Sequence, residues 1–146
     1  MRHLSRRARQ VLKLAQEAAG EYEQGSVGTE HLLLGIVREG ASLGARILLE
    51  QGATEYRVKS VVDELVEDRV LETWVTGRLP GSPHFIDVFA RAGRIAQRLG
   101  QSQICTEHLL AALTTETGSV AYEALHALGL SREIIEEAFQ AQAVQA

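Results

Sequence analysis

Apolar residues recur along this chain at the three- and four-residue spacing that is typical of amphipathic helices. Two examples are Val11, Leu12, Ala15 and Ala19 in one segment, and Val58, Val61, Val62 and Leu65 in another. Such spacing gathers the apolar side chains on one helical face. No segment alternates convincingly between apolar and polar residues, and the nearest candidate, LETWVTGRLPG from Leu71, has the Gly and Pro content of a linker. The pattern predicts an all-α protein.

The same polar triplet opens two of these apolar segments. GTEHLLLGIV begins at Gly28, and CTEHLLAALT begins 77 residues further along, at Cys105. At this offset the two halves align without a gap over residues 5–62. Identical pairs include Ser5 and Ser82, Val11 and Val88, Ala15 and Ala92, Glu39 and Glu116, Leu48 and Leu125, and Gly52 and Gly129. A constant register over this length indicates two copies of one structural unit.

A hydroxyl residue precedes every predicted helix. These residues are Ser5, Thr29, Ser42 and Thr54 in the first copy and Ser82, Thr106, Ser119 and Ser131 in the second. Ser and Thr cap helix N-termini by accepting a hydrogen bond from an otherwise unpaired backbone N–H. We expect eight helices in two pseudo-symmetric four-helix repeats. Repeat one should span about residues 4–66, a linker about 67–81 and repeat two about 82–143, packed as one domain because each repeat is too small to bury much core alone.

Composition narrows the class of protein. With 45% hydrophobic and 23% charged residues in 146, the chain has the balance of a soluble globular domain. No run approaches the ~18 apolar residues of a membrane span, and a net charge of −4 gives no general attraction for nucleic acid. The single cysteine, Cys105, excludes an intrachain disulfide and favours a reducing, cytoplasmic location. We expect neither membrane nor nucleic-acid partners.

Metal and thiol chemistry find little support in the sequence. Cys105 and His108 form a C-x-x-H pair, but no second pair has the spacing of metal ligands. Cys105 as a nucleophile would need a placed base, and the sequence shows none. We interpret this residue as a small, half-buried core residue, and we expect no metal, no cofactor and no catalytic residue.

Six segments carry a resemblance to a known family. LSRRARQVLKLAQEAA, VGTEHLLLGIVREG and ARILLEQGA strongly resemble the N-terminal domain of Clp-type AAA+ unfoldases, and the ClpC branch in particular. SPHFIDVFARAGRIAQRLG, ICTEHLLAAL and YEALHALGLS resemble the second repeat of that domain. The resemblance covers about residues 4–139. It implies an eight-helix double repeat that receives protein substrates and adaptors and is not itself an enzyme. The chain accordingly has no G-x-x-x-x-G-K-[ST] nucleotide-binding motif.

For ClpC-type domains, the resemblance further implies binding of phosphorylated arginine at two equivalent sites. Such a ligand has a phosphoryl group of charge near −2 beside a planar guanidinium, so it needs an anion cradle and a carboxylate. A helix N-terminus provides a cradle, because its free N–H groups point at an anion. The candidate residues are Ser5, Arg7, Thr29 and Glu30 in copy one, and Ser82, His84, Thr106 and Glu107 in copy two.

In this interpretation each triplet faces the first helix of its own copy. Two departures from the family pattern fall in copy two, where Cys105 matches Gly28 and His84 matches Arg7. Cysteine narrows the site, and a neutral histidine holds phosphate less well than arginine. We therefore expect the second site to be weaker, and to strengthen at lower pH as His84 gains charge.

A structural interpretation stands beside the functional one. Thr29 and Thr106 are most simply helix caps, and Glu30 and Glu107 could merely favour the positive ends of their helices. His31 and His108 each open an apolar helix, and we expect packed, hydrogen-bonded side chains there.

Three functions remain open at this point. The first is a recognition domain that feeds marked or adaptor-held proteins to a Clp unfoldase and its protease. The second is a free-standing regulator or accessory subunit that competes for the same adaptors and tagged substrates or docks on a Clp complex. The third is an enzyme, which would require turnover of a substrate by the purified protein. An ATPase segment following residue 146 in the reading frame would select the first, and a stop codon would favour the second.

Overall fold

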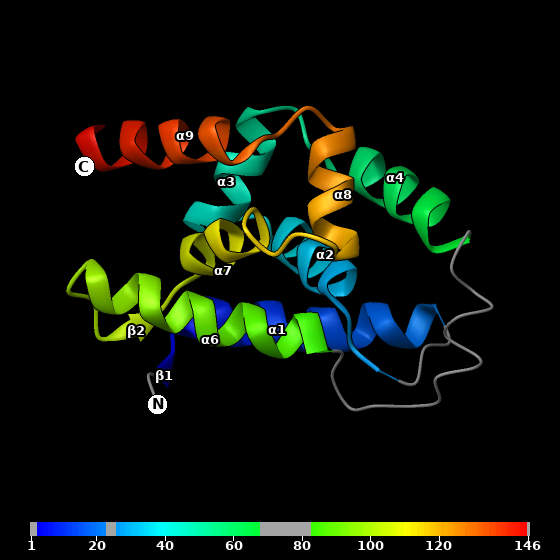
Figure 1. The fold of residues 1–146 in the computed structure, drawn as a ribbon, viewed down its shortest axis with the longest axis horizontal. Helices are drawn as coiled ribbons and strands as arrows, with labels where there is room; N and C mark the ends of the chain where they lie inside the picture. Colours follow the sequence, from blue (N-terminus) through cyan, green and yellow to red (C-terminus); the bar gives the residue numbers. More distant parts are fainter. Residues whose placement is uncertain (1–2, 23–25, 68–82, 146) are drawn as a thin grey trace.

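The structure, a computed structural model, describes residues 3–22, 26–67 and 83–145, and these residues form eight helices and one two-stranded parallel ribbon (Figure 1). In chain order the elements are β1 (His3–Leu4), α1 (Arg6–Glu21), α2 (Thr29–Glu39), α3 (Leu43–Glu50), α4 (Glu55–Glu67), α6 (Pro83–Arg98), β2 (Gln103–Ile104), α7 (Thr106–Leu113), α8 (Val120–Ala127) and α9 (Arg132–Gln145). The prediction of an all-α fold is confirmed. The two short strands were not predicted.

The helices of the second half repeat those of the first at a constant offset of 77 residues. The helix starts pair as Arg6 with Pro83, Thr29 with Thr106, Leu43 with Val120, and Glu55 with Arg132. The predicted linker lies outside the described residues except for Glu67, which ends α4, and Ser82 lies outside them as well. No helix in the described ranges is both long enough and apolar enough to cross a membrane.

One core extends through both repeats. Helix α2 contacts α1, α3 and α4 of its own repeat and α6, α7 and α8 of the other. One continuous cluster of buried aliphatic residues includes Leu32 and Leu48 from the first repeat and Leu109 and Leu125 from the second. Gly35 allows close contact between α2 and α1, because a Cβ atom there would lie 2.6 Å from the Val11 carbonyl oxygen.

Three serines cap their helices as predicted. The side chains of Ser5, Ser42 and Ser119 each accept a hydrogen bond from the backbone N–H of the third residue of α1, α3 and α8. Thr54 and Ser131 accept equivalent bonds at the starts of α4 and α9. Hydroxyl residues therefore begin five of the described helices, at the positions that the sequence pattern gives.

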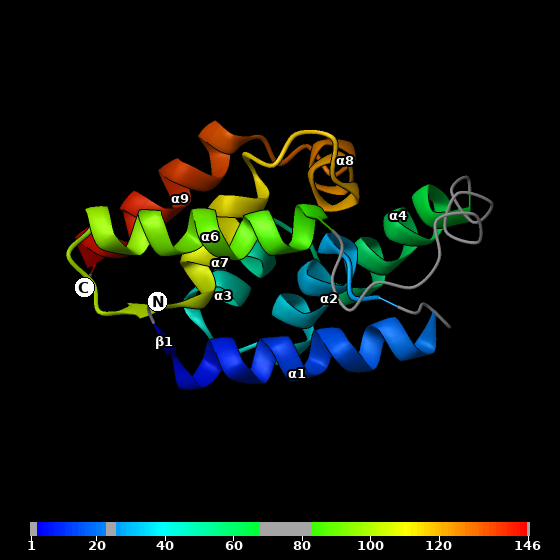
Figure 2. The same ribbon diagram turned by 60° about the horizontal axis from the view of Figure 1, so that its bottom comes forward.

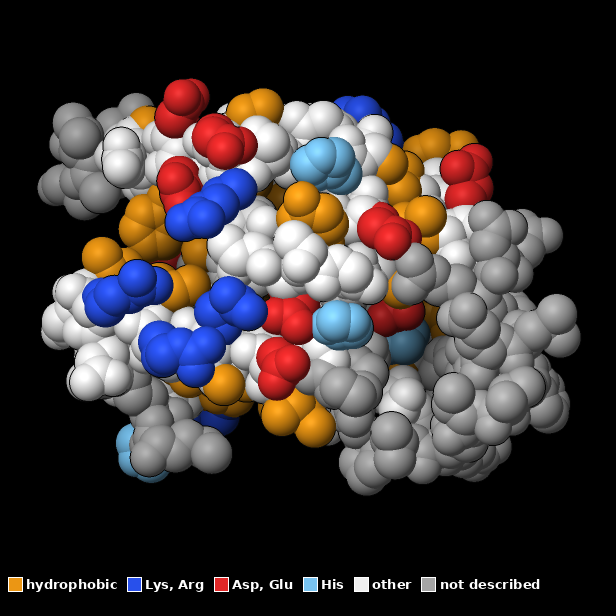
Figure 3. Space-filling model, in the orientation of Figure 1, with side chains coloured by type: hydrophobic (Ala, Val, Ile, Leu, Met, Phe, Trp, Pro, Cys, Tyr) orange, Lys and Arg blue, Asp and Glu red, His pale blue; other side chains and the backbone are white. Residues whose placement is uncertain are grey.

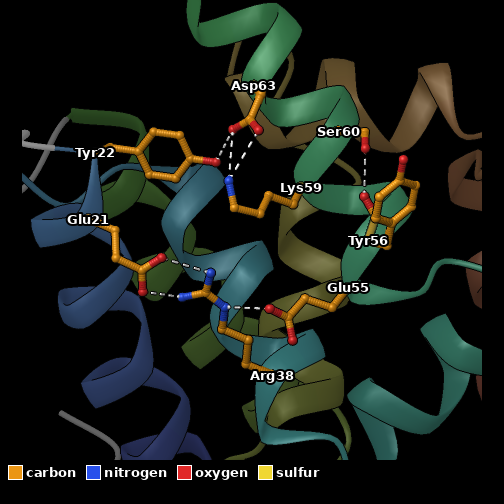
Figure 4. A network of polar contacts seen from close by, with 8 residues as sticks. All are labelled: Glu21, Tyr22, Arg38, Glu55, Tyr56, Lys59, Ser60 and Asp63. Atoms are coloured by element: carbon orange, nitrogen blue, oxygen red, sulfur yellow. Dashed lines mark hydrogen bonds and ion pairs between the residues drawn. The ribbon is translucent and has the colours of Figure 1, made fainter.

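A network of polar contacts joins three helices of repeat one (Figure 4). Arg38 on α2 donates to Glu21 on α1 at 2.8 Å and to Glu55 on α4 at 3.1 Å. Tyr22 donates its hydroxyl proton to Asp63 on α4, which also accepts from Lys59. The matching position to Arg38 in repeat two is Thr115, so this ionic connection belongs to the first repeat alone.

Candidate functional site

The repeated triplet has nearly the same backbone in both copies. Gly28 and Cys105 are the N-cap residues of α2 and α7, with φ and ψ of −106° and 176° at Gly28 and −104° and 171° at Cys105. The N–H of Gly28 donates to Nδ1 of His31 at 2.8 Å, and the N–H of Cys105 donates to Nδ1 of His108 at 2.9 Å. The prediction that both histidines are packed and hydrogen-bonded is confirmed.

The prediction that Thr29 and Thr106 cap their own helices is wrong. Each is the first helical residue, and each hydroxyl is directed to the other repeat. Thr29 Oγ1 accepts from the N–H of Ala121 at 3.1 Å, and Thr106 Oγ1 accepts from the N–H of Gly44 at 3.0 Å. These donors lie in the first turns of α8 and α3, so each threonine satisfies an unpaired N–H across the repeat interface.

The N-terminus of α1 lies at the start of α7, in the opposite repeat. Strands β1 and β2 pair in parallel, with Leu4 opposite Ile104. The N–H of Ser5 then donates to the Ile104 carbonyl at 2.9 Å, directly before the Cys105 N-cap. Ser5 therefore stands beside the triplet of repeat two.

The triplet of repeat one lies at the other end of α1. The ring of His31 packs 5.6 Å from that of Tyr22, which follows the last residue of α1. A 16-residue helix is about 24 Å long, so Glu30 and Ser5 are far apart. The expectation that each triplet faces the first helix of its own copy is wrong, because the N-terminal strand crosses to the other repeat.

The N-terminus of α6 lies beside the start of α2 in both views of the fold (Figures 1 and 2). Val27, one residue before the Gly28 N-cap, forms a β-bridge at the position that matches Ile104. The structure therefore places the N-terminus of α6, which carries His84, at the start of α2, and it places Ser5, the cap of α1, at the start of α7. Both glutamates are half-buried and are the second residues of their helices.

Arg7 is held by a buried carboxylate that the sequence analysis did not place in the site. Its Nη1 atom lies 2.7 Å from Oε2 of Glu39, whose side chain is 4% exposed. Glu39 also accepts from the N–H groups of Ala41 and Ser42. Burial disfavours the charged carboxylate, but the bonds from Arg7 and Ser42 outweigh it and lower the pKa of Glu39. Arg6, Arg7, Gln10 and Glu39 line an open cavity of about 470 Å³.

The second repeat reproduces this arrangement at the start of α6. His84 Nδ1 lies 2.7 Å from the buried carboxylate of Glu116, and Arg91 lies 3.2 Å from the same group. On the face drawn in Figure 3, histidine and acidic side chains lie close together near the middle of the view. Glu39 and Glu116 are 77 residues apart and occupy matching positions in the two repeats. This pairing of identical glutamates between the repeats is the sequence feature that indicates a shared role for them.

Cys105 is half-buried, as predicted. Burial raises the pKa of its thiol, and the charge of Glu107 raises it further, against a smaller opposing effect of a hydrogen bond with the Ser5 side chain. Cys105 therefore lies between Glu107, in the first turn of α7, and Ser5, the cap of α1. No group of three metal-binding side chains occurs in the ranges that the structure describes.

Residues 3–142 match the family model of the Clp repeat (R) N-terminal domain. The chain belongs to this family. This Clp N-terminal domain is 35% identical over 132 residues to the negative regulator of genetic competence ClpC/MecB of Bacillus subtilis, and 34% identical over 125 residues to the chaperone protein ClpB of Oceanobacillus iheyensis. Each match covers 86% of this chain but only 15% of the relative.

Solved structures of Clp N-terminal domains share the fold. The N-terminal domain of ClpD from Arabidopsis thaliana superposes with a TM-score of 0.74 at 21% identity, covering 97% of each chain. The Hsp104 N-terminal domain from Candida albicans gives a TM-score of 0.67 at 15% identity, covering 93% of this chain and 88% of that one.

Proposed function

We propose that this Clp N-terminal domain recognises proteins that carry phosphoarginine, together with Clp adaptors, and presents them to a Clp unfoldase and its protease. The observation that supports the proposal is the placement of each triplet glutamate opposite the first-helix N-terminus of the other repeat. Each of the two sites is then shared between the repeats. The proposal involves no catalysis, cofactor, metal, nucleic acid or membrane, and it locates the protein in the cytoplasm.

The ligand's two charged groups match the two sides of such a site. The phosphoryl group would lie at the N-terminus of α1 or α6, where free N–H groups and the helix dipole favour an anion. Arg7 or His84 stands in the first turn, anchored by Glu39 or Glu116. Arg7 is 58% exposed and gives one N–H to Glu39, so other N–H groups of its guanidinium can face a phosphate. Glu30 or Glu107 would accept from the ligand guanidinium.

Replacing Glu30 by alanine tests the carboxylate's role. A charge-assisted hydrogen bond contributes about 1.5–3 kcal/mol, so the E30A variant should bind phosphoarginine about 10- to 100-fold more weakly. Isothermal titration calorimetry of the whole chain measures this, with free arginine and phosphoserine as comparison ligands. E133A is the matched control, because Glu133 is an exposed acid at the same position of α9.

Binding of arginine or phosphoserine as tightly as phosphoarginine would contradict the proposal. An E30A variant that binds normally but loses as much thermal stability as a helix-cap variant would show that Glu30 is structural.

A further inference from the structure

Gly28 and Cys105 hold equivalent N-cap positions with matching backbone angles, but only one of them leaves room for a carboxylate. The Glu30 side chain folds back over Gly28. A Cβ atom built on Gly28 would lie 1.9 Å from Glu30 Oε1 and 2.9 Å from its carboxyl carbon. No side chain larger than hydrogen fits there while Glu30 keeps this position.

Cys105 carries such a Cβ atom, so Glu107 cannot take the position over residue 105 that Glu30 takes over residue 28. The thiol occupies this side of the N-cap instead, 3.9 Å from the Gln103 carbonyl oxygen. It provides no substitute negative charge, because burial and the nearby Glu107 raise the pKa of the thiol. At the start of α7 the carboxylate position is therefore lost, although the adjoining first turn of α1 keeps its basic residues, Arg6 and Arg7.

We propose that the residue at this N-cap position decides which site accepts a guanidinium, so that the domain binds one phosphoarginine, between Gly28–Glu30 and the start of α6. This inference rests on the proposed function and makes it specific to one site. It also changes the expectation from the sequence, since Cys105 and His84 belong to different sites. The site that accepts the ligand is the one with histidine, because it has the glycine.

Calorimetric stoichiometry measures the number of sites directly. The whole chain should bind one phosphoarginine, Cys105→Gly should bind two, and Cys105→Ala should still bind one, because alanine keeps the Cβ atom. Cys105→Ala thus separates the steric effect from loss of the thiol. In the reverse direction, Gly28→Ala should weaken the single site at least tenfold. If Cys105→Gly does not fold, Gly28→Ala decides the question.

Two equal sites in the unsubstituted chain, or equal stoichiometry in Cys105→Ala and Cys105→Gly, would overturn the inference. If no variant binds phosphoarginine, the proposed function fails, and a crystal structure of Cys105→Gly decides the inference alone. A Glu107 carboxylate lying over the N-cap in that structure would support it. A Glu107 carboxylate that stays away would overturn it.

Discussion

The hydroxyls of Thr29 and Thr106 each accept a hydrogen bond from the first turn of a helix in the other repeat. Both hydroxyls are almost completely buried and accept from N–H groups in the first turns of α8 and α3. A buried N–H without a partner costs about 1–3 kcal/mol, more than a typical exposed cap. These threonines therefore hold the two repeats together, independently of any ligand.

Thr29→Val should lower the free energy of unfolding by about 1–3 kcal/mol, because it keeps the side-chain shape and leaves the Ala121 N–H unpaired. Urea denaturation measures the loss. Thr54→Val removes an exposed cap bond to Arg57 and should cost about 1 kcal/mol or less. Thr29→Ser should restore most of the stability. If Thr29→Val and Thr29→Ser lower the free energy of unfolding equally, the hydroxyl bond to the Ala121 N–H does not stabilise the repeat interface.

His31 is kept neutral by its surroundings. Burial lowers its pKa to about 4, and burial also lowers the pKa of His108. Because Nδ1 accepts from the N-cap N–H, the ring proton sits on Nε2, which is buried without a partner in the described part of the chain. Protonation would place a charge in the core and break the bond to the N-cap.

The free energy of unfolding should therefore fall on acidification between about pH 6.5 and pH 4. In that range the unfolded state takes up a proton at His31 that the folded state does not, which costs about 1.4 kcal/mol per pH unit. His31→Gln should reduce the loss between pH 7 and pH 5 by about 2 kcal/mol. His126→Gln is the control, because His126 is exposed. If the free energy of unfolding falls equally in both variants between pH 7 and pH 5, the buried neutral state of His31 is not the cause of the acid sensitivity.

At the scale of elements, the sequence predicts which segments are equivalent but not which of them meet. The apolar spacing and the 77-residue offset are enough to predict the helices and the repeats, because each helix carries its own periodicity and cap. Strands β1 and β2 have two residues each, too few to show an alternating pattern. Their pairing moves Ser5 to the triplet of repeat two, and nothing local in the sequence indicates this exchange.

The candidate residues were predicted from the sequence through their resemblance to a family, whereas their grouping required the fold. Glu30 and Glu107 are correctly placed in the first turns of α2 and α7. Their partners were exchanged, because the sequence-based grouping assumed that each repeat completes its own site. The anchoring carboxylates Glu39 and Glu116 were overlooked as parts of the site, since their role depends on contacts about 30 residues away in the chain.

At the scale of the whole molecule, the repeat interface includes part of the core, the threonine bonds and both candidate sites. Helix α2 and its counterpart α7 each contact both repeats, so each proposed site is shared between them. The proposed recognition would therefore depend on the same interface that stabilises the fold. Variants such as Thr29→Val, which weaken the interface, must be tested for folding before binding is compared.

Glu30 and the start of α6 are proposed to form one phosphoarginine site. NMR titration of the ¹⁵N-labelled chain with phosphoarginine tests it most directly, with arginine as the control ligand. We predict that the amides of residues 28–31 and of the first turn of α6, from His84 onward, shift together along one binding curve. Shifts that instead couple residues 28–31 to residues 5–8, with the start of α6 unchanged, would contradict the shared site.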